Sequence, residues 1–200
     1  MKLNASYLKI FADLLIPILG FLWWNWSIYF ILLFLLLDLA VSEVLVHLKT
    51  KKIKSYSEKV VLKQWVKFGV YSFLLFIMST VAIHIGMKQI HFDINFTDEI
   101  YNFLSYKEMG VAQGIVLIPL VVFMGYSQYK TEFLIPQVFR GISFEKLWKN
   151  YFIVHFSLFG FILLMGLLAA VTNFNEWVYL GIMLLSILTY KLLLLRKSLN

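Results

Sequence analysis

Long apolar runs dominate this chain and restrict what it can fold into. Six stretches carry few charges, at about residues 7–24, 26–48, 66–87, 111–126, 151–171 and 177–195. An α-helix rises about 1.5 Å per residue, so roughly 20 apolar residues cross the ~30 Å hydrocarbon core of a bilayer. The sequence therefore predicts an all-α integral membrane protein with a bundle of about six transmembrane helices.

The overall composition agrees with a membrane protein. Hydrophobic residues make up 61% of the 200 residues and charged residues only 14%, whereas a soluble domain is nearer half apolar and about a quarter charged. The links between the apolar stretches are too short for a second folded domain, so residues 1–200 are predicted to form one transmembrane domain. The chain has no cysteine, which excludes disulfides, thiolate metal sites and cysteine nucleophiles.

Basic residues gather in alternate links between the apolar stretches. With six crossings, 14 of the 18 basic residues fall on one side of the membrane: Lys2, Lys49, Lys51, Lys52, Lys54, Lys59, Lys63, Lys67, Lys130, Arg140, Lys146, Lys149, Arg196 and Lys197. Short basic loops face the cytoplasm, which predicts cytoplasmic N- and C-termini. Lysine greatly outnumbers arginine, as in proteins of AT-rich bacterial genomes, so we expect a bacterial inner membrane.

The densest lysine run follows the second apolar stretch and includes Lys49, Lys51, Lys52 and Lys54. We first interpret this run as a determinant of membrane topology. It is also predicted to contact anionic lipids, or an acidic partner, at the cytoplasmic face. Nucleic acid is not an expected partner, because the run lies directly beside the membrane.

The link after the third stretch has a pattern of its own. Residues 91–97 alternate between apolar and polar, which predicts a short extended segment. Thr97 is then the predicted N-cap of a short amphipathic helix with Asp98 and Glu99 in its first turn. We expect this helix to lie on the outer membrane surface, or alternatively to form a lid over an outward cavity.

Proline, glycine and serine mark further features of the helices. Pro119 predicts a kink in the fourth stretch, and Pro136 is predicted to break the chain after that stretch. Ser143 is a predicted N-cap of the helix that leads into the fifth stretch. Small residues at 110 and 114, and at 166, 169 and 170, predict close packing between helices.

Ionisable residues inside membrane spans are costly and are functional-site hypotheses by default. The first two stretches hold Lys9, Asp13, Asp38 and Glu43. Asp13 and Asp38 lie at similar distances from the turn at Asn25, so an antiparallel hairpin places them at nearly the same depth. One interpretation is a structural ion pair with Lys9. The other is a site for a proton, a cation or a basic solute group.

His47 and His155 are the histidines that six crossings place near the same side, and they are candidate haem or metal ligands. No ligand spacing such as H-E-x-x-H accompanies them, so no cofactor is predicted. Nucleophile-elbow and phosphate-loop motifs are also missing from the sequence.

Three functions remain open at this stage. The first is a solute-binding or transport component that uses the intramembrane acidic cluster. The second is a non-catalytic subunit or assembly factor of a larger membrane complex. The third is a lipid-modifying enzyme with Asp38, Glu43 and His155 as acid–base groups. In size and six-span arrangement the chain resembles substrate-capture subunits of bacterial vitamin importers, a likeness of shape that carries over no residue.

Overall fold

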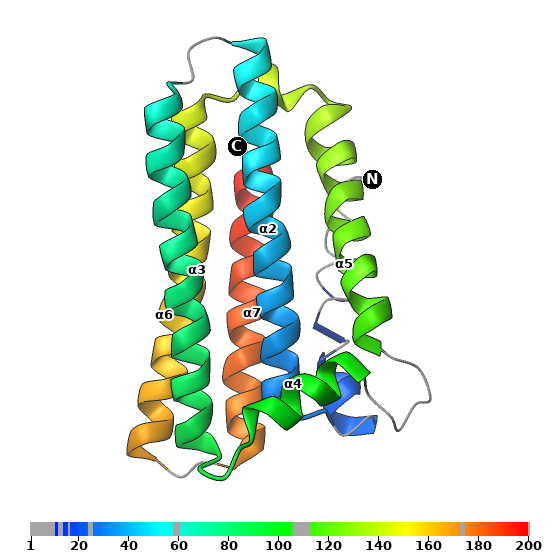
Figure 1. The fold of residues 1–200 in the computed structure, drawn as a ribbon, viewed down its shortest axis with the longest axis vertical. Coiled ribbons are helices and arrows are strands. Elements are labelled where there is room, and N and C mark those ends of the chain that lie inside the picture. Colours follow the sequence, from blue (N-terminus) through cyan, green and yellow to red (C-terminus); the bar gives the residue numbers. More distant parts are fainter. Residues whose placement is uncertain are drawn as a thin grey trace.

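The computed structural model describes residues 11, 14–15, 17–23, 26–57, 61–105, 113–172 and 175–199, and within them it contains helices and no strand. Part of the predicted first stretch, including Lys9 and Asp13, lies outside the described residues. The elements, shown in Figure 1, are α2 (Ile28–Tyr56), α3 (Leu62–Ile90), α4 (Phe96–Ser105), α5 (Gln113–Tyr129), the π-helical turn η2 (Lys130–Leu134), the 3₁₀ turn η3 (Val138–Arg140), α6 (Phe144–Val171) and α7 (Glu176–Leu199).

Three of these helices, α2, α3 and α6, are long and apolar enough to cross a membrane, and α7 is apolar over Glu176–Thr189. The prediction of an all-helical membrane protein is therefore supported. The count of six spans and the cytoplasmic placement of both termini stay predictions.

The helix α2 extends eight residues beyond the predicted span, to Tyr56. It begins where the Ser27 hydroxyl accepts a hydrogen bond from the Phe30 amide at 3.1 Å. Its 29 residues give a length of about 43 Å, which spans both the hydrocarbon core and the headgroup region. The lysine run is thus part of this helix. The end of an apolar stretch indicates where the membrane is expected to end, whereas the helix itself continues beyond that point.

The link between α3 and α4 differs from the prediction. Residues 91–97 are not extended: the Ile94 amide donates to the His91 carbonyl, and α4 begins at Phe96. Asn95, not Thr97, caps α4, since its side-chain oxygen accepts from the Thr97 amide at 3.1 Å. The alternation of apolar and polar residues over 91–97 therefore belongs to a turn and to the start of α4, and not to an extended segment.

The predicted amphipathic helix is confirmed as α4, which lies across one end of the bundle in Figure 1. Phe103 is buried and packs edge-on against Phe30 of α2, with ring centroids 4.9 Å apart. Its apolar face therefore contacts the bundle.

The helices α3 and α6 run parallel, with α2 and α7 antiparallel to them (Figure 1). Near one end Phe68 stacks on Phe144, and near the other an ideal Cβ at Gly86 would lie 3.4 Å from the Gly166 Cα. The two backbones approach closely there, as the small residue at 166 predicted. Ser143 caps α6 by accepting from the Lys146 amide, as predicted.

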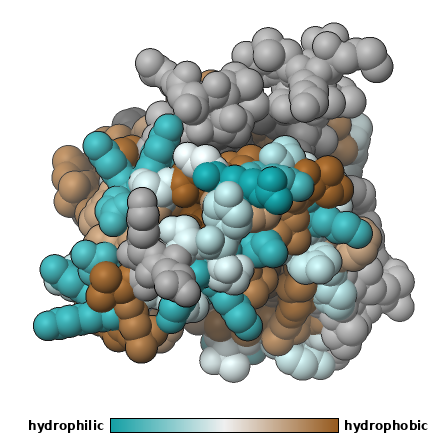
Figure 2. Space-filling view, turned by 90° about the horizontal axis from the view of Figure 1, so that it is seen from above, coloured by the Kyte–Doolittle hydropathy of each residue, from teal (hydrophilic) through white to brown (hydrophobic). Residues whose placement is uncertain are grey.

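The two ends of the bundle differ in charge. Figure 2 looks down on the end where α2 finishes and α3 and α6 begin, and it shows hydrophilic side chains gathered there. Exposed basic residues of this end, here called the basic end, include Lys51, Lys54, Lys63, Arg140 and Lys149. The opposite end, called the acidic end, carries Asp93, Asp98, Glu99, Glu176 and the single described lysine Lys88.

Candidate functional site

The predicted residue Glu43 lies at the centre of a polar cluster between three helices. Its carboxylate accepts hydrogen bonds from the hydroxyls of Ser72 on α3 and Tyr151 on α6, and it lies 3.3 Å from the Nε2 of His47 on α2. The Glu43 side chain is only 14% exposed. These residues and Trp65, which contacts His47, are called the Glu43 cluster. Through one carboxylate the cluster joins α2, α3 and α6.

The hydrogen bonds around His47 fix its tautomer. The indole Nε1 of Trp65 donates to His47 Nδ1 at 2.9 Å, and an indole N–H can only donate. Nδ1 is therefore unprotonated, so the ring proton is on Nε2, which donates to Glu43. Gly69 makes room for this ring, because a Cβ there would lie 2.9 Å from His47 Cε1.

His155 lies against the same cluster. Its Nδ1 donates to the Tyr151 carbonyl at 2.9 Å, and its ring stacks on the Tyr151 ring with centroids 3.8 Å apart. The side chain is buried, and both Glu43 and Asp38 are close enough to act on it electrostatically. Tyr151 therefore connects Glu43 with His155. The predicted acidic residues Asp38 and Glu43 both act electrostatically on the His155 ring.

Two parts of the predicted site are not tested by the structure and remain predictions. Lys9 and Asp13 lie outside the described residues, so their pairing and depth are untested. The structure brings His47 and His155 to the same region, but both ring nitrogens of His47 hold hydrogen bonds. Within the described ranges no three histidine or acidic side chains converge as metal ligands, and haem or metal ligation by these residues stays a prediction.

A second polar cluster near the acidic end was not predicted. Tyr29 donates its hydroxyl to His84 Nε2 at 2.8 Å, and His84 Nδ1 donates to the Thr80 carbonyl at 2.8 Å. The Ser27 hydroxyl donates to Glu99 of α4, also at 2.8 Å. These five residues are called the His84 cluster. Tyr29 and His84 are 55 positions apart, and neither belongs to a sequence pattern that pairs them.

The acidic end also contains a cavity of about 470 Å³. It is lined by Ser27, Ile28, Met87, Ile90, His91, Phe92, Asp93, Ile94, Glu99 and Glu176. Glu99 belongs to α4, so this helix forms part of the cavity wall, in keeping with the lid hypothesis. His91 and Glu176 lie 3.2 Å apart, and Lys88 donates to the carbonyls of Phe92 and Ile94 at 3.0 Å.

The predicted lipid-contacting lysines partly face aromatic rings of the chain itself. The Nζ atoms of Lys49, Lys52 and Lys54 lie 5.7, 5.0 and 5.7 Å from the ring centroids of Phe133, Phe139 and Trp65. Such cation–π contacts hold the lysine run against η2, η3 and α3. Lys51 is exposed. Contact of these lysines with anionic lipids stays a prediction.

Comparison of the chain with protein-family models, curated proteins and solved structures finds no match. The geometry of the two clusters therefore carries the functional argument alone.

Proposed function

We propose that this chain is a solute-binding or transport component of a membrane, most simply a bacterial inner membrane. In this proposal the acidic residues Asp38 and Glu43 take a proton, a cation or the basic group of a solute. The observation that carries it is the Glu43 carboxylate, which is placed on a membrane-crossing helix and contacted by groups from three helices. Ionisable groups at such depth are costly and usually serve function.

The Glu43 cluster supports a way to couple binding to helix movement. A cation at the carboxylate would compete with the hydroxyls of Ser72 and Tyr151 for its oxygens. Loss of those hydrogen bonds would weaken the connections from α2 to α3 and α6, and the preferred arrangement of the bundle would change. His155 of α6 stacks on Tyr151, and the carboxylates of Glu43 and Asp38 both act on its ring electrostatically. The acidic-end cavity supplies a cation-attracting opening on the other side.

A second candidate, a subunit of a larger membrane complex, is supported by the outer face of α3. This face exposes a long row of large apolar side chains: Val66, Val70, Phe73, Leu74, Ile77, Met78, Val81 and Ile85. Such a row can contact lipid tails as well as a neighbouring subunit. It therefore supports the subunit candidate less strongly than the Glu43 cluster supports transport.

Native mass spectrometry of the tagged protein, extracted gently from its own membrane, separates these candidates. Transport or binding predicts a lone chain with a reproducible small-molecule mass. Asp38→Asn should remove that mass while the protein still accumulates, and the control Asp98→Asn, at an exposed acid that does not line the acidic-end cavity, should retain it. A stoichiometric complex with other chains would favour the subunit candidate. A lone chain without a bound mass, and with Asp38→Asn unchanged in every respect, would contradict the proposal.

A further inference from the structure

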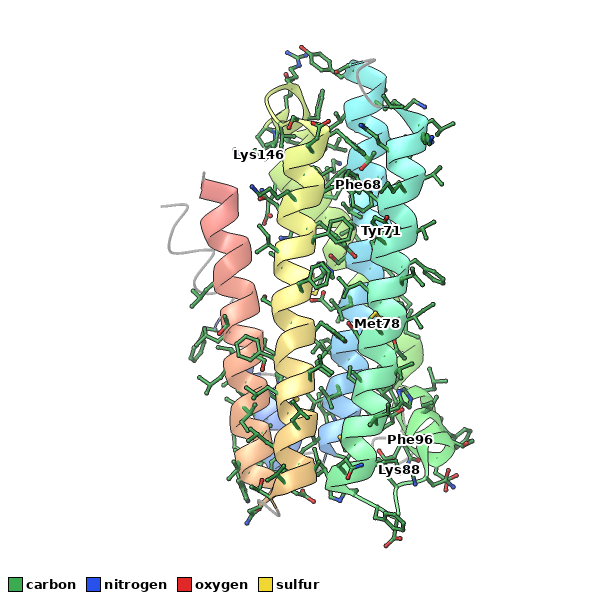
Figure 3. All side chains as sticks on the ribbon, turned by 90° about the vertical axis from the view of Figure 1, so that its left-hand side faces the viewer. Phe68, Tyr71, Met78, Lys88, Phe96 and Lys146 are labelled. Atoms are coloured by element: carbon green, nitrogen blue, oxygen red, sulfur yellow. The ribbon has the colours of Figure 1, made fainter. Side chains whose placement is uncertain are left out.

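A wide groove, whose lining does not include Glu43, runs along the outer face of the α3–α6 pair. Its volume is about 1110 Å³, slightly above the usual range of roughly 300–1,000 Å³ for small-molecule pockets. It is lined by Phe68, Tyr71, Glu145, Lys146, Trp148, Lys149, Asn150, Phe152, Ile153 and Phe156. Figure 3 shows Phe68 and Tyr71 beside α6, with Lys146 nearer the basic end.

The groove changes in chemistry along its length. Towards the basic end its rim carries Lys146 and Lys149 with one acid, Glu145. A third lysine, Lys67, holds its Nζ atom 5.7 Å from the centroid of the Tyr71 ring in the groove wall. Deeper along α6 the lining is apolar and half exposed, with Ile153 at 43% and Phe156 at 57%. The groove therefore has a positive rim and an apolar floor.

The length of the groove matches one leaflet of a bilayer. From Lys146 to Phe156 the α6 backbone rises about 15 Å, which is half of the roughly 30 Å hydrocarbon core. Both helices that form the groove are candidate membrane spans. A molecule lying in it would thus have its head at the lysines and its tail among aromatic rings.

We propose that the α3–α6 groove binds one anionic phospholipid, with the phosphate at Lys146 and Lys149 and an acyl chain along Phe68, Phe152 and Phe156. The charge of the rim selects an anionic headgroup, and the apolar floor at membrane depth selects an acyl chain over a free phosphate. This site is separate from the predicted lipid contacts at Lys49–Lys54, and it does not depend on the transport proposal.

The headgroup contact is tested by native mass spectrometry of the full chain in mild detergent, titrated with phosphatidylglycerol or with phosphatidylcholine of the same acyl chains. The wild type should retain one phosphatidylglycerol in preference to phosphatidylcholine. Each lysine near an anionic surface strengthens binding by about fivefold, so K146Q/K149Q should weaken phosphatidylglycerol retention by about tenfold or more. The control K130Q/R140Q removes the same charge from exposed residues of η2 and η3 that do not line the groove, and it should change retention by less than about twofold.

The tail contact is tested by filling the groove without changing its charge. Ile153→Trp places a larger ring in the groove and should lower phosphatidylglycerol retention, whereas Leu163→Trp should not. The two positions are matched, because both lie on α6 and both are 43% exposed, but Leu163 does not line the groove. This pair keeps the test valid if the lysine double variant fails to fold.

Four results would overturn the proposal. Equal retention of the two lipids would mean that the rim does not select an anionic headgroup. An equal loss in K130Q/R140Q would mean that general charge attraction accounts for binding. Unchanged retention in a folded Ile153→Trp protein would place the lipid elsewhere. A dimer in the spectra that Ile153→Trp abolishes would show that a second copy of the chain covers the groove.

Discussion

The Glu43 cluster and the His84 cluster both place a histidine among hydrogen-bonding partners on membrane helices, yet they use opposite tautomers. In the Glu43 cluster, Trp65 donates to Nδ1 of His47, so the proton is on Nε2. In the His84 cluster, the Thr80 carbonyl accepts from Nδ1, so Nε2 of the neutral ring accepts from Tyr29. The first ring presents a donor to a carboxylate, and the second presents an acceptor to a hydroxyl.

This difference separates the roles of the two clusters. The Glu43 cluster gathers donors from α2, α3 and α6 around one charge. In the His84 cluster the charged residue is Glu99, on the surface helix α4, and it contacts Ser27 at the positive N-terminus of α2. We infer that the first cluster holds the bundle together at the Glu43 carboxylate, whereas the second fixes α4 beside the acidic-end cavity.

The largest expected effect comes from removing each carboxylate in turn. Glu43→Leu leaves the Tyr151 hydroxyl and the Nε2–H of His47 without their acceptor, and it leaves the Ser72 hydroxyl only its bond to the Gly69 carbonyl. Hydrogen bonds between membrane helices contribute about 0.6–1.7 kcal/mol each, so the loss should be about 2–5 kcal/mol. Glu99→Leu removes one such bond and should cost about 1 kcal/mol. Denaturant titration in mixed micelles measures both values, and equal losses would contradict the assigned roles.

A smaller effect is expected from Ser27→Ala, which acts only on the His84 cluster. This change removes both the N-cap of α2 and the hydrogen bond to Glu99, with a cost of about 0.5–2 kcal/mol. Hydrogen exchange should rise in Phe96–Ser105 and in the first turn of α2. Residues around Ser72 should exchange as in the wild type, and faster exchange there would show that the clusters are not independent.

The smallest expected effect on stability concerns the tautomers of His47 and His84. These tautomers are also the clearest difference between the two clusters. Nitrogen-15 NMR should find His47 as the Nε2–H form and His84 as the Nδ1–H form. Trp65→Phe removes the donor to His47 and should mix its tautomers, at a stability cost of about 1 kcal/mol. His84 should keep its form in this variant. A wild-type spectrum with the same tautomer at both rings would refute the hydrogen-bond assignment.

Hydropathy and charge predicted the helices of the bundle because a membrane leaves few ways to satisfy backbone hydrogen bonds. The same signals did not predict that α2 continues to Tyr56. They also misplaced the cap of α4, which depends on a local hydrogen bond of Asn95. Glu43 was found because a charge in an apolar run stands out. Its partners Ser72 and Tyr151 were not, because 29 and 108 positions separate them from Glu43 and no periodicity links them.

The most direct test of the account is a double-mutant cycle between Glu43 and Tyr151, read as the free energy of unfolding in mixed micelles. Tyr151→Phe, Glu43→Leu and the double variant are compared with the wild type. The account predicts that the two single losses exceed the loss of the double variant by about 0.5–2 kcal/mol, because one hydrogen bond is counted twice. Additive losses would contradict a direct bond between α2 and α6 at this carboxylate, and the Glu43 cluster would then lose its central place.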